Sequence, residues 1–487
     1  MYVARISSFP ANDQVVFFEG RRFNAFSFSN GDQSIDFMRW LEKRSLSPIS
    51  EDEIEDPRVF AMLCRMGFIS HDINDVAEDV AEKHNSCFDG LSNASVHLIV
   101  AQYCNLKCSY CYNGEDSYKL AKKPRMSKDT AEQAVRIFMR YLDPKHGNLS
   151  INFLGGEPLL GWSVIEYVLE NMDDWASEEG FIGRIFTSLQ TNLSFLPPSF
   201  IEVVRRHRVR ILVEIDGPKA VHDDARGHKV RAISSFDATQ KNCKEIKSAG
   251  IEFDCKAVLT SKNITKLVEV KETHMNLGAR SSSYSELRPV NSDGHSVDIE
   301  ALPNLHQISE ALNSHYEDKD EDTPLMAQTK SKACANMLRS ASRNTIGCHQ
   351  KHAAIFSVTA DGEIYNCPWF VQNADHFVGH VSDRCVDRGR AVANVRHLST
   401  QPDEVCRKCA YFGGCGGGCP VTRELSKGDT GLVDYVRNIR CATYIPAIQS
   451  IILSRLRNQH VRPHRMRERS KPDRAVASAQ GSYPGSP

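Results

Sequence analysis

Apolar and polar residues alternate in a strand-and-helix rhythm through the middle of the chain. Short apolar runs predict six strands, at Val96–Ala101, Leu149–Leu154, Arg184–Gln190, Val209–Ile215, Ile251–Leu259 and Tyr284–Val290. Segments with helical spacing lie between them, for instance Lys128–Tyr141, Val164–Met172, Phe236–Ala249 and Ile264–Leu277. Such alternation is typical of parallel βα units, so the expected fold class is α/β, with its core over residues 95–320.

The first part of the chain has a different pattern. The run Val15–Phe28 predicts a β-hairpin that turns at Glu19-Gly20, and helical patterns follow at Ser34–Glu42 and Asp52–Met66. We interpret residues 1–85 as a small winged-helix-like α+β module, joined to the core by a linker over residues 86–94. The alternative is a plain extension that caps the core.

Composition and charge narrow the class of protein. The chain has 487 residues, 41% of them hydrophobic, and a net charge of −1, so no global field favours nucleic acid or membrane partners. It has no apolar run long enough to span a membrane and no signal-peptide pattern, so a cytoplasmic location is expected. Sixteen cysteines in a reducing compartment indicate metal or cluster binding rather than disulfides. Residues 461–487 lack periodicity and predict a disordered tail.

Three closely spaced cysteines, Cys104, Cys108 and Cys111, directly follow the first predicted strand of the core. Three thiolates can hold one iron–sulfur cluster, and in a four-iron cluster they leave one iron open to a substrate or cofactor. The alternative is a structural zinc knuckle. Zinc needs a fourth ligand at similar spacing, and none lies close after Cys111.

Polar residues also gather where the next strands end. The turn Gly155-Gly156-Glu157 follows the second strand, and Asn192 follows the third. Glycine lets a backbone approach a ligand closely, and a carboxylate can accept from an ammonium group. Because the active sites of parallel barrels lie at the carboxyl ends of the strands, these residues and the cysteine triplet are expected to share one site.

Together these motifs resemble the radical SAM superfamily. The resemblance implies a partial (β/α)6 TIM-like barrel in which Cys104, Cys108 and Cys111 are catalytic and hold a [4Fe–4S] cluster that binds S-adenosyl-L-methionine (SAM). It implies the following cofactor-binding residues: Tyr110, Gly155, Gly156, Glu157, Asn192, Glu214, Asp216 and Arg226. Glu214 stands where the family usually has Ser. Arg226 either pairs with the methionine carboxylate or braces Asp216 or Asp223.

A second cysteine set lies in residues 330–445. It consists of Cys348, Cys367, Cys406, Cys409, Cys415, Cys419 and Cys441. This set resembles the cysteine-rich SPASM domain. The resemblance implies two auxiliary [4Fe–4S] clusters, which need eight ligands, and Cys334 is placed to be the eighth. One cluster would use Cys334, Cys348, Cys367 and Cys419, and the other Cys406, Cys409, Cys415 and Cys441. A pair of zinc ribbons is the alternative, and Cys385 is an alternative ligand.

The resemblance implies a radical SAM/SPASM enzyme whose 5′-deoxyadenosyl radical abstracts hydrogen from a residue of a ribosomally made peptide or protein. The N-terminal pattern resembles the PqqD-like leader-recognition domain, which binds an extended peptide at a sheet edge. We expect an oxidative cross-link (thioether, C–C or C–O) and an electron donor such as flavodoxin or ferredoxin. The alternatives are a sulfatase-type formylglycine maturase, or another protein-cofactor maturase, and a non-catalytic zinc or cluster scaffold.

Overall fold

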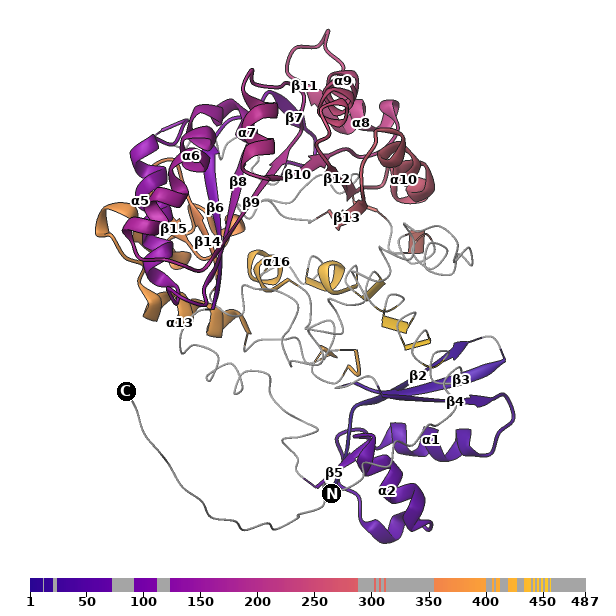
Figure 1. The fold of residues 1–487 in the computed structure, drawn as a ribbon. Coiled ribbons are helices and arrows are strands. Elements are labelled where there is room, and N and C mark those ends of the chain that lie inside the picture. Colours follow the sequence, from indigo (N-terminus) through magenta and orange to yellow (C-terminus); the bar gives the residue numbers. More distant parts are fainter. Residues whose placement is uncertain are drawn as a thin grey trace, which may run out of the picture.

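A curved sheet of parallel strands forms the centre of the protein (Figure 1). The computed structural model describes residues 1–71 except 12 and 21–23, residues 92–111, 123–287 and 354–399, and short separate stretches within 302–311 and 405–456. The barrel strands are β6 (Asn93–Ala101), β8 (Asn148–Gly155), β9 (Arg184–Thr191), β10 (Arg210–Glu214), β12 (Phe253–Leu259) and β13 (Ser282–Glu286). Each runs parallel to its neighbours, which confirms the predicted α/β class.

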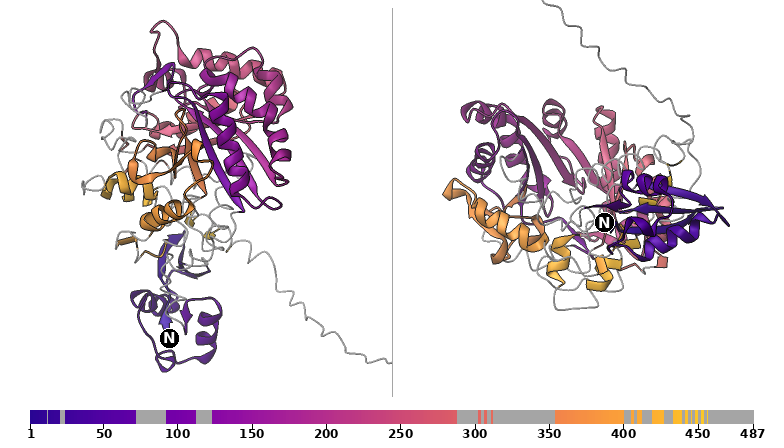
Figure 2. Two further views of the ribbon diagram at one scale, coloured as in Figure 1. Left: turned by 90° about the vertical axis from the view of Figure 1, so that its left-hand side faces the viewer. Right: turned by 90° about the horizontal axis from the view of Figure 1, so that it is seen from below.

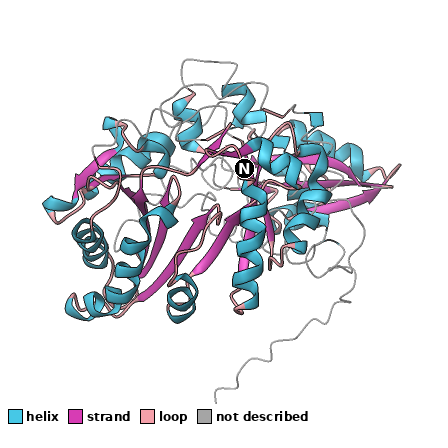
Figure 3. Ribbon diagram, turned by 90° about the horizontal axis from the view of Figure 1, so that it is seen from above, coloured by secondary structure: helices cyan, strands magenta, loops and turns pink. Residues whose placement is uncertain are grey.

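Helices line the outer, convex face of this sheet (Figure 3). They are α5 (Lys128–Tyr141), α6 (Trp162–Glu178), α7 (Phe200–Arg206), α8 (Lys219–Ala225), α9 (Ser235–Ser248) and α10 (Leu267–Asn276). Short 3₁₀ turns at Pro158–Gly161 and Ile264–Lys266 precede α6 and α10. Ser127 and Ser234 cap α5 and α9 by accepting from backbone N–H groups of the first turn, which explains where these helices begin.

The two faces of the sheet differ in polarity. Along β6 the even positions, from Ala94 to Val100, are buried beneath the helices, whereas Ser95 and His97 are partly exposed on the concave face. On that face the Asn152 amide donates to Ser95 Oγ at 2.9 Å, and the Ser188 hydroxyl donates to Asn152 Oδ1 at 2.6 Å. The apolar core therefore lies between sheet and helices, and the concave face is left for polar groups.

Strands from the C-terminal part continue the same sheet. β14 (Ile355–Val358) pairs parallel with β6, and β15 (Glu363–Tyr365) and β16 (Phe377–His380) follow antiparallel. The described helices of this part include α13 (Arg388–Ser399) and α16 (Pro420–Leu425), with short 3₁₀ turns at Pro368–Phe370, Ala374–His376 and Val381–Asp383. The sequence did not predict these strands. The sheet order is β13-β12-β10-β9-β8-β6-β14-β15-β16.

The N-terminal module forms a separate body at one end of the molecule (Figure 2). Its antiparallel sheet has the order β2-β3-β4, and a two-stranded ladder of β1 and β5 joins the two ends of the module. Its elements are β1 (Tyr2–Val3), β2 (Ile6–Ala11), β3 (Gln14–Glu19), β4 (Ala25–Ser29), α1 (Ser34–Lys43), a 3₁₀ turn (Glu51–Glu53), α2 (Pro57–Arg65) and β5 (Ile69–Ser70).

Both faces of the module's sheet are covered, which explains the nearly continuous apolar run in β3. Phe17 faces α1 and α2, where it joins a core with Leu41 and Leu63. On the other face Phe18 packs on Tyr411 of the C-terminal part, with ring centroids 4.9 Å apart. The module is therefore held against the C-terminal part through an apolar contact.

Some predicted boundaries differ from those observed. The helix expected over Asp52–Met66 begins only at Pro57, because the extended Asp56 caps it. β6 begins at Asn93, inside the expected linker over residues 86–94. The predicted tail over residues 461–487 lies outside the described residues. None of the described helices has the length and apolar character needed to cross a membrane.

Candidate active site

The cysteine triplet lies on a loop that leaves the carboxyl end of β6. Part of this loop is a short strand, β7 (Leu106–Cys108), which pairs antiparallel with β11 (Arg226–His228) from the segment beyond β10. The register sets Cys108 opposite Arg226. This ladder fixes the cysteine loop to a part of the barrel more than a hundred residues later in the chain.

The thiols of the triplet have buried surroundings. Cys104 Sγ accepts from the backbone N–H of Leu106 at 3.3 Å and from the Asn192 amide at 3.7 Å. Burial raises the pKa of the Cys104 thiol to about 12 and raises that of Cys108 as well, and the nearby charge of Cys111 adds to both effects. Thiolates at these positions therefore need a bound cation to balance their charge.

Three thiols on one loop are a donor set that fits an iron–sulfur cluster. Among the described residues, no three His, Cys, Asp or Glu side chains are grouped so that they could hold one metal ion. In a cubane cluster each thiolate binds a different iron, so the three sulfurs need not converge on one point. The N–H donors at Cys104 are contacts of the kind that tune cluster potential.

Glu157 is buried behind the cysteine loop at the end of β8. Its carboxylate accepts from the Leu159 N–H at 3.0 Å, the Thr191 hydroxyl at 2.7 Å and the Asn192 N–H at 2.8 Å. Burial raises its pKa to about 7 in spite of these donors. A positively charged ligand beside it would favour the ionised form.

Close contact between β6 and β8 explains the two glycines before Glu157. A Cβ atom on Gly155 would lie 2.3 Å from the carbonyl oxygen of Ala101, so no other residue fits there. The Gly156 N–H donates to the same carbonyl at 2.8 Å. Asn192 connects this turn to the triplet, because its backbone binds Glu157 while its side chain reaches Cys104.

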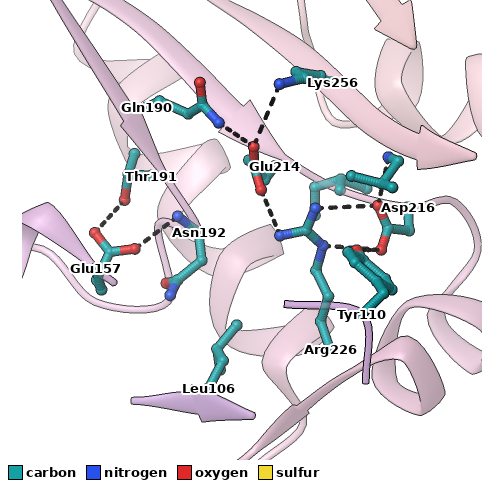
Figure 4. A network of polar contacts seen from close by, with 12 residues as sticks. Leu106, Tyr110, Glu157, Gln190, Thr191, Asn192, Glu214, Asp216, Arg226 and Lys256 are labelled. Carbon is teal, nitrogen blue, oxygen red and sulfur yellow. Dashed lines mark hydrogen bonds and ion pairs between the residues drawn. The ribbon is translucent and has the colours of Figure 1, made fainter. Parts of the chain in front are cut away.

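Arg226 is the centre of a buried polar network (Figure 4). Its Nε donates to Asp216 Oδ2 at 2.9 Å, and its Nη1 donates to Glu214 Oε2 at 2.6 Å. The Tyr110 hydroxyl donates to the same oxygen of Asp216, and the guanidinium carbon lies 5.4 Å from the centre of the Tyr110 ring. Gln190 donates to the other oxygen of Glu214.

The charges of this network offset one another. Burial by itself would raise the pKa of both carboxyl groups. Arg226, together with Lys256 at Glu214 and the Tyr110 hydroxyl at Asp216, outweighs it and holds both pKa values below their usual range. Burial opposes the charge of Arg226 too, and the two carboxylates with Tyr110 keep its pKa well above the ordinary value. All three side chains therefore carry full charge in the folded protein.

Of the two roles considered for Arg226, the observed contacts correspond to bracing. The guanidinium is engaged by Glu214 and Asp216, whereas Asp223 accepts from Ser234, Ser235 and the Phe236 N–H. Tyr110, directly before the third cysteine, is joined to the same network, so the cysteine loop and the end of β10 are held together by side chains as well as by the β7–β11 ladder.

Sequence reasoning missed Lys256 of β12. Its ammonium lies 3.8 Å from Glu214 Oε1 on the concave face of the sheet. A signal was present, because Lys256 is the only cation in the otherwise apolar stretch Cys255–Leu259. A cation at the centre of a mostly apolar strand indicates polar neighbours on one face of the sheet.

The second cysteine set is described in part. Cys367 and Cys419, predicted for one auxiliary cluster, pack in the same small group with Phe370 and Val421. Of the other predicted group, Cys409 donates its N–H to the Cys406 carbonyl at 3.2 Å and lies beside the apolar contact of the N-terminal module. Cys334, Cys348 and Cys415 lie outside the described residues.

Comparison with known protein families gives a match in the barrel. Residues 98–272 match the model of the radical SAM superfamily, a range that includes the cysteine triplet, Glu157, Asn192 and the Arg226 network.

Three relatives are similar to this chain in sequence, and the name of one of them carries the same superfamily. An uncharacterized protein of Methanocaldococcus jannaschii is 29% identical over 45% of this chain and 70% of its own length. A cysteine-type anaerobic sulfatase-maturating enzyme of Clostridium perfringens is 24% identical over 70% of this chain and 91% of its own length. A radical SAM cyclopropyl synthase, TigE of Paramaledivibacter caminithermalis, is 26% identical over 40% of this chain and 43% of its own length.

Solved structures share the fold. The tagged enzyme anSMEcpe with bound AdoMet aligns with a TM-score of 0.61 at 20% identity, covering 75% of this chain and 98% of that one. Streptococcus suis SuiB bound to its precursor peptide SuiA aligns with a TM-score of 0.51 at 15% identity, covering 88% of this chain and 97% of that one.

Proposed function

Residues 98–272 form a radical SAM domain, and from this premise we propose that the protein is a radical SAM enzyme that modifies a ribosomally made peptide or protein. The observation that carries the proposal is the convergence of the cysteine triplet, Glu157 and Asn192 at the carboxyl ends of parallel strands. The relatives named for sulfatase maturation and cyclopropyl synthesis support a protein or peptide substrate.

Each residue of the site has a role in this proposal. Cys104, Cys108 and Cys111 would hold the [4Fe–4S] cluster, and Glu157 would accept from the SAM amino group. With cluster and SAM bound, the pair supplies a one-electron cleavage that yields a 5′-deoxyadenosyl radical able to abstract hydrogen. Arg226 keeps Tyr110 and the cysteine loop in place. The polar concave face offers hydrogen-bond partners to a substrate backbone.

We assign an oxidative cross-link as the reaction. An oxidation must pass on a second electron, and the predicted auxiliary clusters at Cys334–Cys441 are suited to accept it. Formylglycine formation is the second candidate, because the match to the sulfatase-maturating relative covers 91% of that relative's length. The same match covers 70% of this chain. The rest can include a substrate-recognition module, which formylglycine formation does not require, and this favours the cross-linking reaction.

The function is tested by anaerobic reconstitution with iron and sulfide, followed by dithionite and SAM. We expect 5′-deoxyadenosine, and with a co-encoded precursor peptide a product lighter by two hydrogen atoms per cross-link. A formylglycine product would support the second candidate. Absence of 5′-deoxyadenosine from protein that has bound iron, with substrate present, would show that the chain is a scaffold.

The N-terminal module offers a sheet edge for the substrate. The Glu19 N–H donates to the Asn24 carbonyl at 3.0 Å, and the register pairs Phe17 with Phe26. Because backbone bonds alternate along an antiparallel pair, Ser27 turns its N–H away from β3. Within the described residues, no strand pairs with this side of β4, so an extended leader segment could add there as a further strand.

Replacing Ser27 by proline should weaken precursor binding about three- to tenfold, since it removes one outward N–H and the backbone bond it would make. Fluorescence anisotropy with labelled precursor measures the affinity. Ser27→Ala is the matched control, because it loses the hydroxyl and keeps the N–H. Equal affinity of the proline variant and the control, at unchanged thermal unfolding, would exclude this edge as the leader site.

A further inference from the structure

An exposed apolar pair stands among cations beside the cysteine loop. Val230 and Ile233 are 54% and 44% exposed, in the turn that connects β11 to α9. Lys229 and Arg231 are exposed beside them, and Lys107 is exposed on the paired strand β7. We call these five residues the basic apolar patch.

The patch is built on the ladder that carries the triplet. The Lys229 N–H donates to the Asn105 carbonyl, next to Cys104, at 3.0 Å. The Lys107 side chain lies over Gly227, where an added Cβ would be 3.6 Å from its Cε. The turn itself is ordered by the Val230 N–H donating to His228 Nδ1 at 3.0 Å and by the Ile233 N–H donating to the Val230 carbonyl at 3.0 Å.

The positive charge of the patch is not neutralised by its described neighbours. No carboxylate among the described residues forms an ion pair with Lys107, Lys229 or Arg231. The nearest acids on α8 and α9 have other partners: Asp223 binds Ser234 and Ser235, Asp224 pairs with Lys262, and Asp237 pairs with Lys219. A partner that approaches the cysteine loop from this side therefore meets cations around an apolar centre.

We infer that the basic apolar patch is the docking surface for an acidic one-electron carrier protein that reduces the enzyme. An apolar centre with a charged rim is the usual anatomy of a protein interface, and opposite charge speeds the encounter of transient partners. The surface lies directly over the loop that would hold the cluster, which is where an electron must enter. This inference rests on the proposed function.

The electron balance is simple. The reduced carrier gives up one electron and is oxidised by one, and the cluster that the triplet would hold is reduced by one. No bond forms and no proton must cross the interface. The partner therefore needs only to bring its redox group near the loop and then leave, which a small, salt-sensitive contact allows.

Binding of an oxidised flavodoxin to the full-length reconstituted protein tests the surface without any need for turnover. We expect Arg231→Glu with Ile233→Ser to lower the affinity about tenfold or more at low salt, and Lys229→Glu to do the same. Affinity of the wild-type protein should fall as salt rises, and less steeply in the variants. Lys145→Glu with Ile182→Ser is the matched control, since both residues are exposed at the opposite end of the barrel and Ile182 is 73% exposed.

A second readout separates docking from catalysis. In the Arg231/Ile233 variant, 5′-deoxyadenosine formation driven by reduced flavodoxin should fall about tenfold, while the dithionite-driven rate stays within about twofold of wild type. Unchanged flavodoxin affinity in both patch variants, or weaker binding of precursor peptide in place of flavodoxin, would overturn the inference. A wild-type protein that binds flavodoxin but yields no 5′-deoxyadenosine with dithionite would refute the proposed function and leave the docking surface standing.

Discussion

Replacing Cys104, Cys108 and Cys111 together by alanine should remove about four irons per chain and abolish SAM cleavage. The three thiols lie on one loop, and this loop is held to the barrel by the β7–β11 ladder, so the protein should keep its fold when the sulfurs are lost. Without thiolates the loop offers no ligand of matching softness. The effect on activity is therefore complete rather than partial.

Iron and sulfide analysis after anaerobic reconstitution measures this result. If the auxiliary clusters are also present, about eight irons should remain in the triple variant. Cys243→Ala serves as the control, because Cys243 is fully buried in the apolar core between α9 and the sheet and should bind no iron. Iron content that is the same in the triple variant and in wild type would contradict the assignment of the triplet.

The second large effect is expected at Arg226. Arg226→Met keeps most of the side-chain volume but leaves Asp216 buried without its cation, whereas Glu214 keeps Lys256 at 3.8 Å. Breaking a buried ion pair by removing one partner costs about 3–5 kcal/mol, because the remaining charge is uncompensated. Asp216 is fully buried, so water cannot replace the guanidinium. Urea denaturation followed by circular dichroism should show this loss at pH 7.

The pH dependence of stability should change sign in this variant. In wild type the pKa values of Glu214 and Asp216 lie below their usual range, so their contribution is present at neutral pH and is lost as pH falls through those lowered values. Without Arg226, burial dominates and raises the pKa of Asp216. The variant should therefore gain stability from neutral pH down to about pH 5, as the carboxyl group takes up a proton.

Two further variants test whether the unpaired buried charge causes the loss of stability. Adding Asp216→Asn to Arg226→Met should recover part of the lost stability, since it removes one unpaired charge. Arg210→Met is the surface control: the Arg210 side chain is 66% exposed, and its partner Asp254 keeps Arg280, so a loss below about 1 kcal/mol is expected. If Arg226→Met weakened SAM binding at unchanged stability, Arg226 would be a cofactor ligand and not a brace.

The periodicity of apolar residues along the chain predicted most of the strands and helices of the barrel. The six barrel strands and helix α5 follow from apolar periodicity, whereas the serine caps that begin α5 and α9 were recognised only in the structure. The need for glycine at Gly155 follows from a close contact of two strands, which a Gly-Gly-Glu turn signals. The β14–β16 strands escaped prediction because each has four residues or fewer, too few to show a period.

By itself, the sequence determined the parallel α/β class, the cysteine triplet at the end of the first barrel strand and the polar residues at the ends of the next strands, because these features depend on neighbours in the chain. Only the tertiary structure decided that Arg226 pairs with Glu214 and Asp216, that Lys256 joins them, and that β7 and β11 form one ladder. These contacts join different strands and loops, from 10 positions apart for Arg226 and Asp216 to more than a hundred for the β7–β11 ladder, so they depend on how sheets and loops pack, and a single sequence carries no local signal for that packing.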